Sequence, residues 1–515
     1  MSHTFKLSAI SLAALLAACG GGGSDPVNSP ATTPPGATTP PVASVAPSVE
    51  PALDAAKAFL IRFDASLATA IPTPGAAAFA LTDGCYLVDG RSKTYSVADF
   101  DADPLAVASR QASVGSTRGN VKVLAERTAP NADGTSRREI DVKYDVTYKD
   151  GSKFESPDNA VPDETIISGS SAGAKLADGS ACTTPDSKSD WRFYGNRKLV
   201  RTFVSAINER TERTALATGL AVTPQVVYSK YLGLGVQDTA NVASYAIITG
   251  PGLSVTTTGA VGSLKFISVR VLRTAPELAG KPGNVVDGLD TNSWRPCQNA
   301  VGNNAAAAET ADCVANGGTG NTIGFFSNAS GAALDTSFAT LNIKAGDTYT
   351  FAIYNDDGWK TVNGQAGKTP IATYTNILRA LPFSAATLAG TGVTADLFAR
   401  FTSNTKTPVE IATAIRTKAA ISTDATWAAP SAMPDGRLTQ LNDTYVSEQG
   451  NANANGTAFP RSRQNFFSYP GTQATAAKFT IPVPVTALVL PTFTSIGLEY
   501  NNRNGNNVFS TYTWQ

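Results

Sequence analysis

Histidine is almost absent from this sequence: its 515 residues contain one, His3. The Ser-His-Asp and Cys-His arrangements of hydrolases need an imidazole to take the proton of the nucleophile. Many zinc, copper and haem sites need imidazole nitrogen as a ligand. If His3 lies in a cleaved segment, all of these classes are excluded. Any chemistry would then have to use carboxylates, lysine, tyrosine or a Ser-Lys pair.

Charged residues are also scarce. Lysine and arginine together number 41, aspartate and glutamate also number 41, and the four make up 16% of the chain. A nucleic-acid interface needs a concentrated excess of basic side chains, so this balance argues against nucleic acid as a partner. A long apolar run is missing from the body of the chain as well. The stretch 481–490 is apolar but short, and Pro482 and Pro484 interrupt it, so it predicts no membrane-spanning helix.

The first 18 residues have the organisation of an export signal. A polar end carries Lys6, and an apolar run from Leu7 to Leu16, too short to span a bilayer, follows it. The run ends in Leu-Ala-Ala-Cys at positions 16–19. This ending resembles the lipobox of bacterial lipoproteins. In that family the cysteine receives a diacylglycerol, the peptide before it is removed, and the new amine is acylated, commonly with palmitate.

The resemblance implies that residues 1–18 are a signal peptide and that Cys19 becomes the first residue and the membrane anchor. Several acyl chains, at about 0.8 kcal/mol per buried methylene, make such an attachment permanent. His3 would leave with the signal, so the mature chain would contain no histidine. In lipoproteins an Asp after the lipidated cysteine favours the inner membrane, so Gly20 implies the outer membrane, with either face left open. The alternative is an ordinary signal peptide in which Cys19 is coincidental.

Residues 19–51 predict a spacer. Four glycines at 20–23 follow the cysteine, and residues 26–51 are mostly Pro, Ala, Thr, Val and Ser without apolar periodicity. Such a segment cannot bury enough surface to offset the entropy lost on ordering, so we expect a disordered, locally extended chain. It would lift a folded body off the membrane.

Four further cysteines predict two disulfides, because an even number in an oxidising compartment usually pairs. Of the three pairings, Cys85–Cys182 with Cys297–Cys313 is the simplest, since each bridge stays within one predicted domain. The second would close a loop of about 15 residues and contribute roughly 3 kcal/mol on the chain-entropy model. Free buried thiols are the alternative. No Cys-x-x-Cys spacing exists, so zinc is disfavoured and no metal or other cofactor is expected.

Residues 52–223 predict an α+β domain. A helix over 52–68 would bury one face, and two strands over 121–126 and 140–148 would pair through a turn at 131–134. The apolar residues of the helix recur at three- and four-residue spacing: Ala56, Phe59, Leu60, Phe63 and Leu67. A further hairpin is expected between 191–194 and 199–204. A leading helix followed by long antiparallel hairpins is similar in element order to nuclear-transport-factor-2-like folds.

Residues 224–419 predict an antiparallel β-sandwich-like domain with a disulfide loop and a C-terminal helix. Short β patterns separated by Gly- and Asn-rich turns are typical of sandwiches. The clearest are 242–249, 264–271, 322–326, 341–343 and 349–354. Thr407-Pro408-Val409-Glu410 is a capping box with proline at the first helical position, and it predicts a helix running to about residue 415.

Residues 420–515 predict a second β-sandwich-like domain. The segment 425–430 is similar to the first strand of fibronectin-type-III-like modules. Alternating residues at 496–500, a turn at 501–507 and a strand over 508–514 predict a terminal hairpin. The fold class expected for the whole chain is therefore β-rich and multidomain: an α+β domain followed by two antiparallel β-sandwich-like domains.

Three motif matches are weak. Residues 169–173 fit the Gly-x-Ser-x-Gly elbow around Ser171, but no strand leads into it and no histidine exists to activate the serine, so a polar loop is the better interpretation. Residues 390–395 loosely fit a dinucleotide fingerprint with Glu410 as ribose acid, without a βαβ unit. Residues 99–110 begin like an EF-hand but place Pro104 where glycine is needed, so an EF-hand is rejected.

Two kinds of looser site were also considered. Calcium could bind at 99–103, at Asp287 with Asp290, or at Asp356 with Asp357, but plain turn residues are the better interpretation of these carboxylates. Aromatic rings beside polar turns could stack on a sugar, but buried packing anchors are the simpler interpretation. The rings concerned are Trp294, Trp359 and Trp514.

We therefore expect a lipid-anchored outer-membrane protein that acts as a non-catalytic binding or structural component of the cell envelope. Its partners would be the membrane, through Cys19, and a polysaccharide or protein ligand. No catalytic residue is expected. The first alternative is an exported hydrolase that uses two carboxylates, as glycosidases do, because that chemistry needs no histidine. The second is an accessory of envelope assembly or secretion.

Overall fold

The computed structural model describes the folded chain in segments. These are residues 50–68, 80–92, 114–149, 151, 153–156, 162–169, 171, 182, 191–215, 220–238, 240–253, 263–268, 271, 295–296, 322–325, 332–339, 341–360, 367–390, 396–404, 410, 421–432, 437–445, 447–448, 461–464, 476–481, 491–501 and 506–514. None of the helices in these segments is both long and apolar enough to cross a bilayer.

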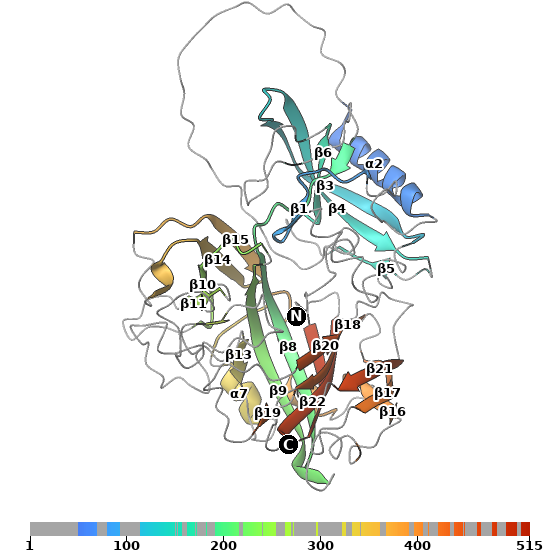
Figure 1. The fold of residues 1–515 in the computed structure, drawn as a ribbon, viewed down its shortest axis with the longest axis vertical. Helices are drawn as coiled ribbons and strands as arrows, with labels where there is room; N and C mark the ends of the chain where they lie inside the picture. The colour runs from blue at the N-terminus through green and yellow to red at the C-terminus, as the bar shows by residue number, and fades with distance from the viewer. Residues whose placement is uncertain are drawn as a thin grey trace, which may run out of the picture.

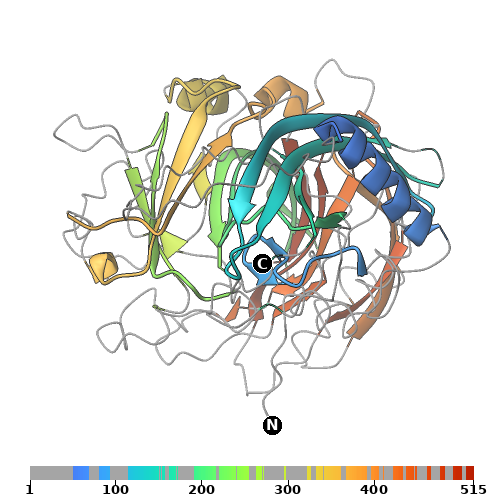
Figure 2. The same cartoon turned by 90° about the horizontal axis from the view of Figure 1, so that it is seen from above.

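Helix α2 (Ala52–Leu67) forms as predicted and covers the first sheet. All five residues of the predicted apolar face are buried, and the sheet beside them supplies the facing side chains. Phe59 and Phe63 each meet the ring of Phe193 edge to face, with ring centroids 4.7 Å apart. Such pairs contribute about 0.5–1.5 kcal/mol beyond their buried area. Figure 2 shows α2 lying beside the long strands of this sheet.

The first sheet contains the predicted hairpin. Strands β3 (Thr117–Pro130) and β4 (Ser136–Thr147) pair antiparallel, and the Gly134 N–H donates to the Asn131 carbonyl at 3.1 Å. Gly134 has a positive φ of 84°, which explains a glycine at this turn. The inward residues of β4 are the alternating ones expected from the sequence: Ile140, Val142, Tyr144 and Val146, continued by Tyr148.

The rest of this body is short. Strands β5 (Lys153–Phe154), β6 (Glu164–Ser168) and β7 (Trp191–Phe193) complete the sheet in the order β3-β4-β6-β7, with β5 beside β4. A separate pair, β1 (Leu87–Val88) and β2 (Arg91–Ser92), lies nearby. We call α2 with β1–β7 the N-terminal body, and Figure 1 shows it at the upper right.

The predicted hairpin between 191–194 and 199–204 is wrong. Strand β7 pairs with β6, whereas β8 (Arg201–Thr214) belongs to a different sheet. The chain leaves one sheet at Tyr194 and enters the next at Arg201. Two strands close in sequence, with a Gly-Asn turn between them, therefore do not pair, because each finds a longer partner elsewhere.

The largest sheet joins segments that are far apart in the sequence. Its order is β13-β9-β8-β23-β22-β18-β20, with β19 beside β22. The strands are β8, β9 (Ala221–Gln237), β13 (Thr322–Phe325), β18 (Arg437–Tyr445), β19 (Ser447–Glu448), β20 (Arg461–Gln464), β22 (Pro491–Asn501) and β23 (Asn506–Trp514). The predicted terminal hairpin is present as β22 and β23.

The pairing of β23 with β8 is parallel and runs from Asn506 opposite Ala206 to Trp514 opposite Thr214. The predicted boundary between 223 and 224 falls inside β9. Strands assigned by sequence to all three domains thus lie in this one sheet, so the sheets do not follow the predicted division. The coarser expectation, a β-rich chain with several antiparallel sheets, is confirmed.

Two smaller sheets complete the structure. One has the order β12-β11-β10-β14-β15, and the other β16-β17-β21. Their strands are β10 (Tyr245–Thr249), β11 (Ser263–Ile267), β12 (Arg295–Pro296), β14 (Thr348–Tyr354), β15 (Ala372–Ile377), β16 (Arg400–Asn404), β17 (Ile421–Ala428) and β21 (Ala476–Ile481). The short helices are α7 (Ala332–Ala339), α8 (Ala385–Leu388) and the 3-10 turn η2 (Gly358–Lys360).

The main core lies between the large sheet and the sheet β12-β11-β10-β14-β15. Apolar side chains of β9, such as Leu232 and Leu234, share one cluster with Ile248 of β10 and Phe351 of β14. The segment 341–343, expected as a strand, is a turn and extended chain whose apolar residues join this core. Of the helix expected after 407, only Glu410 lies within the described residues, and it is helical.

Candidate functional site

The structure contains the bond between Cys85 and Cys182, one of the two predicted disulfides, with the two Cα atoms 5.0 Å apart. Cys85 is fully buried and packs against Ile167 and Tyr194. The bridge ties the segment after β6 to the chain that enters β1. Cys19, Cys297 and Cys313 lie outside the described residues.

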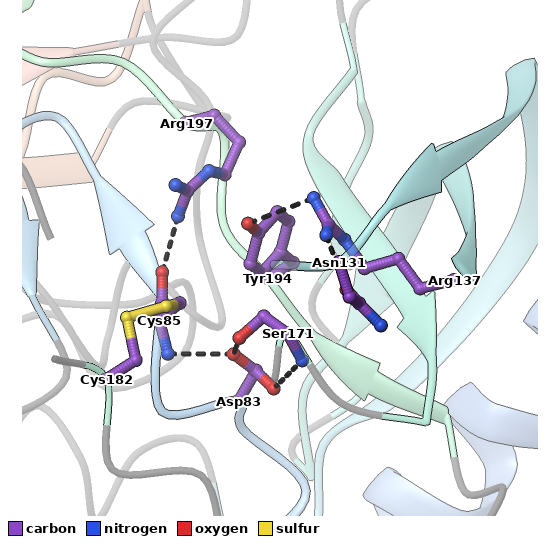
Figure 3. Close-up of a disulfide and its surroundings, with 8 residues drawn as sticks. All are labelled: Asp83, Cys85, Asn131, Arg137, Ser171, Cys182, Tyr194 and Arg197. Carbon is purple, nitrogen blue, oxygen red and sulfur yellow. Dashed lines mark hydrogen bonds between the residues drawn. A yellow bond between two sulfur atoms is a disulfide. The ribbon is translucent and has the colours of Figure 1, made fainter. Parts of the chain in front are cut away.

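The serine of the Gly-x-Ser-x-Gly match lies beside this disulfide (Figure 3). Ser171 is fully buried, and its hydroxyl donates to Oδ1 of Asp83, which is also fully buried. The same carboxylate accepts the Cys85 N–H at 2.7 Å and the Ser171 N–H at 3.3 Å. Three donors on one carboxylate offset the cost of burying its charge. Ser171 is therefore an anchor for the loop, inaccessible to a substrate.

A tyrosine held between two arginines borders the same disulfide (Figure 3). The guanidinium of Arg197 lies 4.0 Å from the centre of the Tyr194 ring, and that of Arg137 lies 5.1 Å from it. Arg197 also donates to the Cys85 carbonyl, and burial lowers its pKa. Arg137 donates to Asn131 at 2.7 Å and pairs with Glu139 at 2.7 Å. Every charged group here has a protein partner, as expected of a structural junction.

The most unusual polar group of the N-terminal body is Glu164 on β6. Its side chain is fully buried on the face of the strand that it shares with Ile166, toward α2. Neither carboxyl oxygen makes a hydrogen bond of ordinary geometry. Burial raises the pKa of Glu164 well above its usual range, the backbone N–H of Gly195 opposes the rise, and the charges of Asp163 and Asp89 add to it. Burial therefore favours the protonated form of this carboxyl.

Tyr86 lies in the same core as Glu164. Its hydroxyl is buried without a hydrogen-bond partner, and burial, followed by the charges of Glu164, Tyr144 and Asp89, raises its pKa well above the usual range. An unsatisfied buried polar group costs about 1–3 kcal/mol. Two such groups in one core make it the strongest candidate for a functional site in the N-terminal body.

Glu164 does not form a carboxylate pair with its neighbour in sequence. Asp163 is a bend residue directly before β6, whose first residue is Glu164, and its carboxylate has partners of its own. The Asp163 carboxylate accepts the Tyr144 N–H at 3.0 Å and lies 3.8 Å from Lys143 Nζ. Burial raises the pKa of Asp163, and Lys143 opposes this rise. The arrangement offers one buried acid with a raised pKa, and Asp163 does not supply the second, converging carboxylate of a glycosidase.

Sequence reasoning did not single out Glu164 or Tyr86. The strand that carries Glu164 is short, and its apolar residues Ile166 and Ile167 give no alternating pattern. The detectable signal was a pair of adjacent acids, Asp163 and Glu164, one residue before the two isoleucines. Its significance depends on Tyr86, which is distant in sequence.

The calcium pair at 356 and 357 proves to be part of a turn. Oδ1 of Asp356 accepts the Tyr245 hydroxyl at 3.0 Å and the Gly358 N–H at 2.8 Å. The Asp357 carboxylate pairs with Lys368 at 2.8 Å. In the described part of the chain, no three acidic, cysteine or histidine side chains gather as metal ligands would.

A buried lysine and stacked aromatic rings surround this turn. Lys265 donates to the Gly358 carbonyl at 2.8 Å, and burial lowers its pKa to about 8. The rings of Tyr245 and Tyr354 stack with centroids 4.6 Å apart. Trp359 is buried in the same cluster, so its ring is a packing anchor, as the simpler interpretation held.

The remaining sites considered from sequence are largely outside the described residues. This applies to 99–103, to Asp287 and Asp290, to Trp294, and to 391–395 of the dinucleotide-like match. Trp514 is the last residue of β23.

Comparison with known proteins identifies no family. No family model matches the sequence, and no curated protein matches it. A tetra-tandem repeat from the extending region of a large adhesion protein aligns over 76% of this chain and 65% of its own, with 11% identity and a TM-score of 0.13. The native conformation of E. coli alpha-2-macroglobulin aligns over 77% and 20%, with 11% identity and a TM-score of 0.11. The chain spans less than two thirds of either protein, and TM-scores this low indicate no common fold.

Proposed function

We propose that this protein is a lipid-anchored component of the bacterial outer membrane whose folded body binds or supports other envelope components without catalysing a reaction. The observation that carries the proposal is the order of the first segments. An apolar signal ends in Leu-Ala-Ala-Cys at 16–19, a Pro/Ala/Thr-rich spacer follows, and a helix begins at Ala52. This is the order expected of a lipid anchor, a flexible linker and a folded domain held away from the membrane.

The contacts of the polar side chains near the disulfide and in the 356–358 turn support a non-catalytic body. Ser171 and Asp83 hold a loop to a disulfide, and Asp356 holds a turn. In each case the side chain is committed to a protein partner that a reaction would have to displace. Arg137 and Arg197, the cations beside the disulfide, are likewise committed to Glu139 and to a backbone carbonyl.

Glu164 favours a second candidate, the carboxylate-dependent hydrolase. A general acid with a raised pKa is one of the two groups that such an enzyme needs. The proposal would require a second carboxylate converging on the same point and access for a sugar. Activity lost in Glu164→Gln but kept in Glu155→Gln, with the fold intact, would favour this candidate.

A third candidate is an accessory of envelope assembly or secretion. Stoichiometric co-purification of another envelope protein with the lipidated chain would favour it. A homogeneous monomer after mild detergent extraction would count against it.

Two experiments test the proposal in order. Metabolic labelling with a palmitate analogue, followed by mass spectrometry of the N-terminal peptide, should find acyl chains on Cys19 and none in Cys19→Ser. Protease treatment of intact cells should then be compared with that of permeabilised cells. Cleavage in intact cells indicates a body outside the cell, and protection until permeabilisation indicates a periplasmic body. An unmodified N-terminus that retains residues 1–18 would refute the anchor.

A further inference from the structure

A polar patch lies on the face of the large sheet that carries the main core. It consists of two residues of β8 and the two residues of β23 in register with them: Arg210, Glu212, Ser510 and Tyr512. Val508, two residues before Ser510 on β23, belongs to the main core, and Tyr228, opposite Arg210 on β9, packs against it. Because side chains alternate along a strand, the polar patch lies on this inner face of the sheet.

Within the described residues, two donors at the centre of the polar patch have no hydrogen-bond partner. They are the Nε–H of Arg210 and the hydroxyl of Ser510, and both atoms are buried. The two residues are direct neighbours across the parallel pair, so their Cβ atoms lie about 5 Å apart. A buried donor without an acceptor destabilises a fold. Two such donors side by side therefore indicate a site for the oxygen atoms of a bound molecule.

The charges at the polar patch are balanced. Arg210 pairs with Glu212 at 2.9 Å, and Arg400 of β16 donates to Asp396 at 3.0 Å. Burial lowers the pKa of Arg400, and its hydrogen bond with Asp396 and the charge of Asp396 outweigh this effect. The charges of Tyr228 and Glu212 raise this pKa further, so Arg400 lies beside the polar patch. An ion would meet a like charge as well as an opposite one here, which favours a neutral ligand.

Aromatic rings border the polar patch on both sides. The ring centre of Tyr228 lies 5.9 Å from that of Phe398, just before β16. On the other side, the indole N–H of Trp427 on β17 donates to the hydroxyl of Tyr500 on β22 at 2.8 Å. Figure 1 shows β17 to the right of the red strands of the large sheet. A few polar groups among aromatic rings are typical of small-molecule sites.

The polar patch reaches solvent at one end. Ser510 is 3% exposed, the side chains of Arg210 and Glu212 are 11% and 17% exposed, and that of Arg400 is 37% exposed. Exposure therefore rises from the two unpartnered donors toward Arg400. A molecule that approaches from the Arg400 end meets Glu212 before it meets the donors.

We propose that the polar patch binds a neutral sugar unit of an envelope polysaccharide, whose oxygen atoms accept hydrogen bonds from Arg210 and Ser510. A sugar hydroxyl both accepts and donates, so a neighbouring hydroxyl can donate to the Glu212 carboxylate. The apolar face of the sugar ring can pack against the ring of Tyr512 or Tyr228. This inference rests on the proposed binding role of the folded body, and it names the class of ligand and the residues that hold it.

The test uses the full mature chain carrying Cys19→Ser, so that no detergent is needed. Isothermal titration calorimetry measures binding of three neutral probes at millimolar concentration: maltotetraose, cellotetraose and the tetramer of N-acetylglucosamine. Tetragalacturonate is the anionic probe. At least one neutral probe should bind, and the anionic probe should not, because it would meet two carboxylates.

Two variants address the donors. Ser510→Ala should weaken binding of the neutral probe by about threefold to tenfold, the loss of one hydrogen bond. Arg210→Lys keeps the charge but lacks the Nε–H, and it should weaken binding by about tenfold to a hundredfold. Thr511→Val is the matched control and should leave the affinity unchanged, because Thr511 follows Ser510 on the opposite face, where its hydroxyl donates to Glu209 at 3.1 Å. Circular dichroism checks that each variant keeps its fold.

Several outcomes would overturn the proposal. They are no binding of any neutral probe, unchanged affinity in both Ser510→Ala and Arg210→Lys, an equal loss in Thr511→Val, or binding of tetragalacturonate alone. A lower unfolding midpoint of Ser510→Ala, without binding of any probe, would assign the two donors to internal water. A neutral probe that binds equally well to all three variants would support the proposed binding role and refute the polar patch as its site, so the two failures remain distinguishable.

Discussion

Replacing Glu164 by glutamine should remove a pH dependence from the stability of the N-terminal body. In the unfolded chain a glutamate loses its proton near pH 4.3, whereas burial among apolar residues raises the pKa of the folded carboxyl well above this value. Between the two pKa values the folded state binds more protons than the unfolded state. Stability is therefore highest below the unfolded pKa and falls as the pH rises toward the folded pKa.

The size of the effect follows from one proton. A single group changes the free energy of unfolding by at most about 1.4 kcal/mol per pH unit, so from pH 5 to pH 7 the loss is up to about 2.7 kcal/mol. Glutamine has nearly the same shape and cannot ionise. Glu164→Gln should therefore equal the wild type at pH 4 and exceed it increasingly toward pH 7.

The assay is urea unfolding at pH 4, 5, 6 and 7, with hydrogen exchange of β4 and β6 amides as a local readout. Asp163 and Asp64 also have pKa values raised by burial, so the quantity to compare is the difference between variant and wild type at each pH. Glu155→Gln, at an exposed position, is the control and should give a difference independent of pH. A constant difference for Glu164→Gln would refute a neutral, buried carboxyl.

Three further predictions address the ties within the fold. Cys182→Ser opens a bridge between residues 97 positions apart, and the chain-entropy model gives a loss of about 4–5 kcal/mol in the free energy of unfolding. The variant should unfold at a lower denaturant midpoint. Reducing agent should lower the midpoint of the wild type by a similar amount and leave that of the variant unchanged. Asp83→Asn removes the charge from a carboxylate that accepts three hydrogen bonds, so thermal unfolding should show a loss of about 1–3 kcal/mol in the free energy of unfolding. Ser171→Ala removes one of the three donors and should cause a smaller loss. A stop codon at Asn506 removes β23 from between β8 and β22, so limited trypsin digestion should cut the large sheet rapidly, whereas deletion of Gln515 alone should not have this effect.

Local elements of this fold are predictable because their signals are local. The face of α2 and the alternation along β4 both reflect burial against a neighbour, and their periods of 3.6 and 2 residues are visible in any window of the sequence. The turn at Gly134 follows from a residue that tolerates a positive φ. Such features need no knowledge of the rest of the chain.

The arrangement of the sheets was not predictable in this way. The partner of β8 across the parallel pairing is β23, about 300 residues later, and no local pattern distinguishes this partner from any other apolar strand. The same holds for Glu164, whose unusual state depends on burial beneath α2 and beside Tyr86. Local sequence patterns predicted three successive domains along the chain. The composition of each sheet, however, is set by pairing between strands that are distant in sequence.

The position of β23 has a consequence for how the protein is made. If the chain is exported from its amino end, as proposed, β8 and β9 emerge before β23, and the edge of β8 stays without its parallel neighbour until the chain is complete. An open edge of this length is a template for pairing with other chains. We therefore expect the nascent protein to depend on chaperones of the envelope until its carboxyl end emerges, and a fusion placed directly after Trp514 to hinder the last step of folding more than one placed at the spacer.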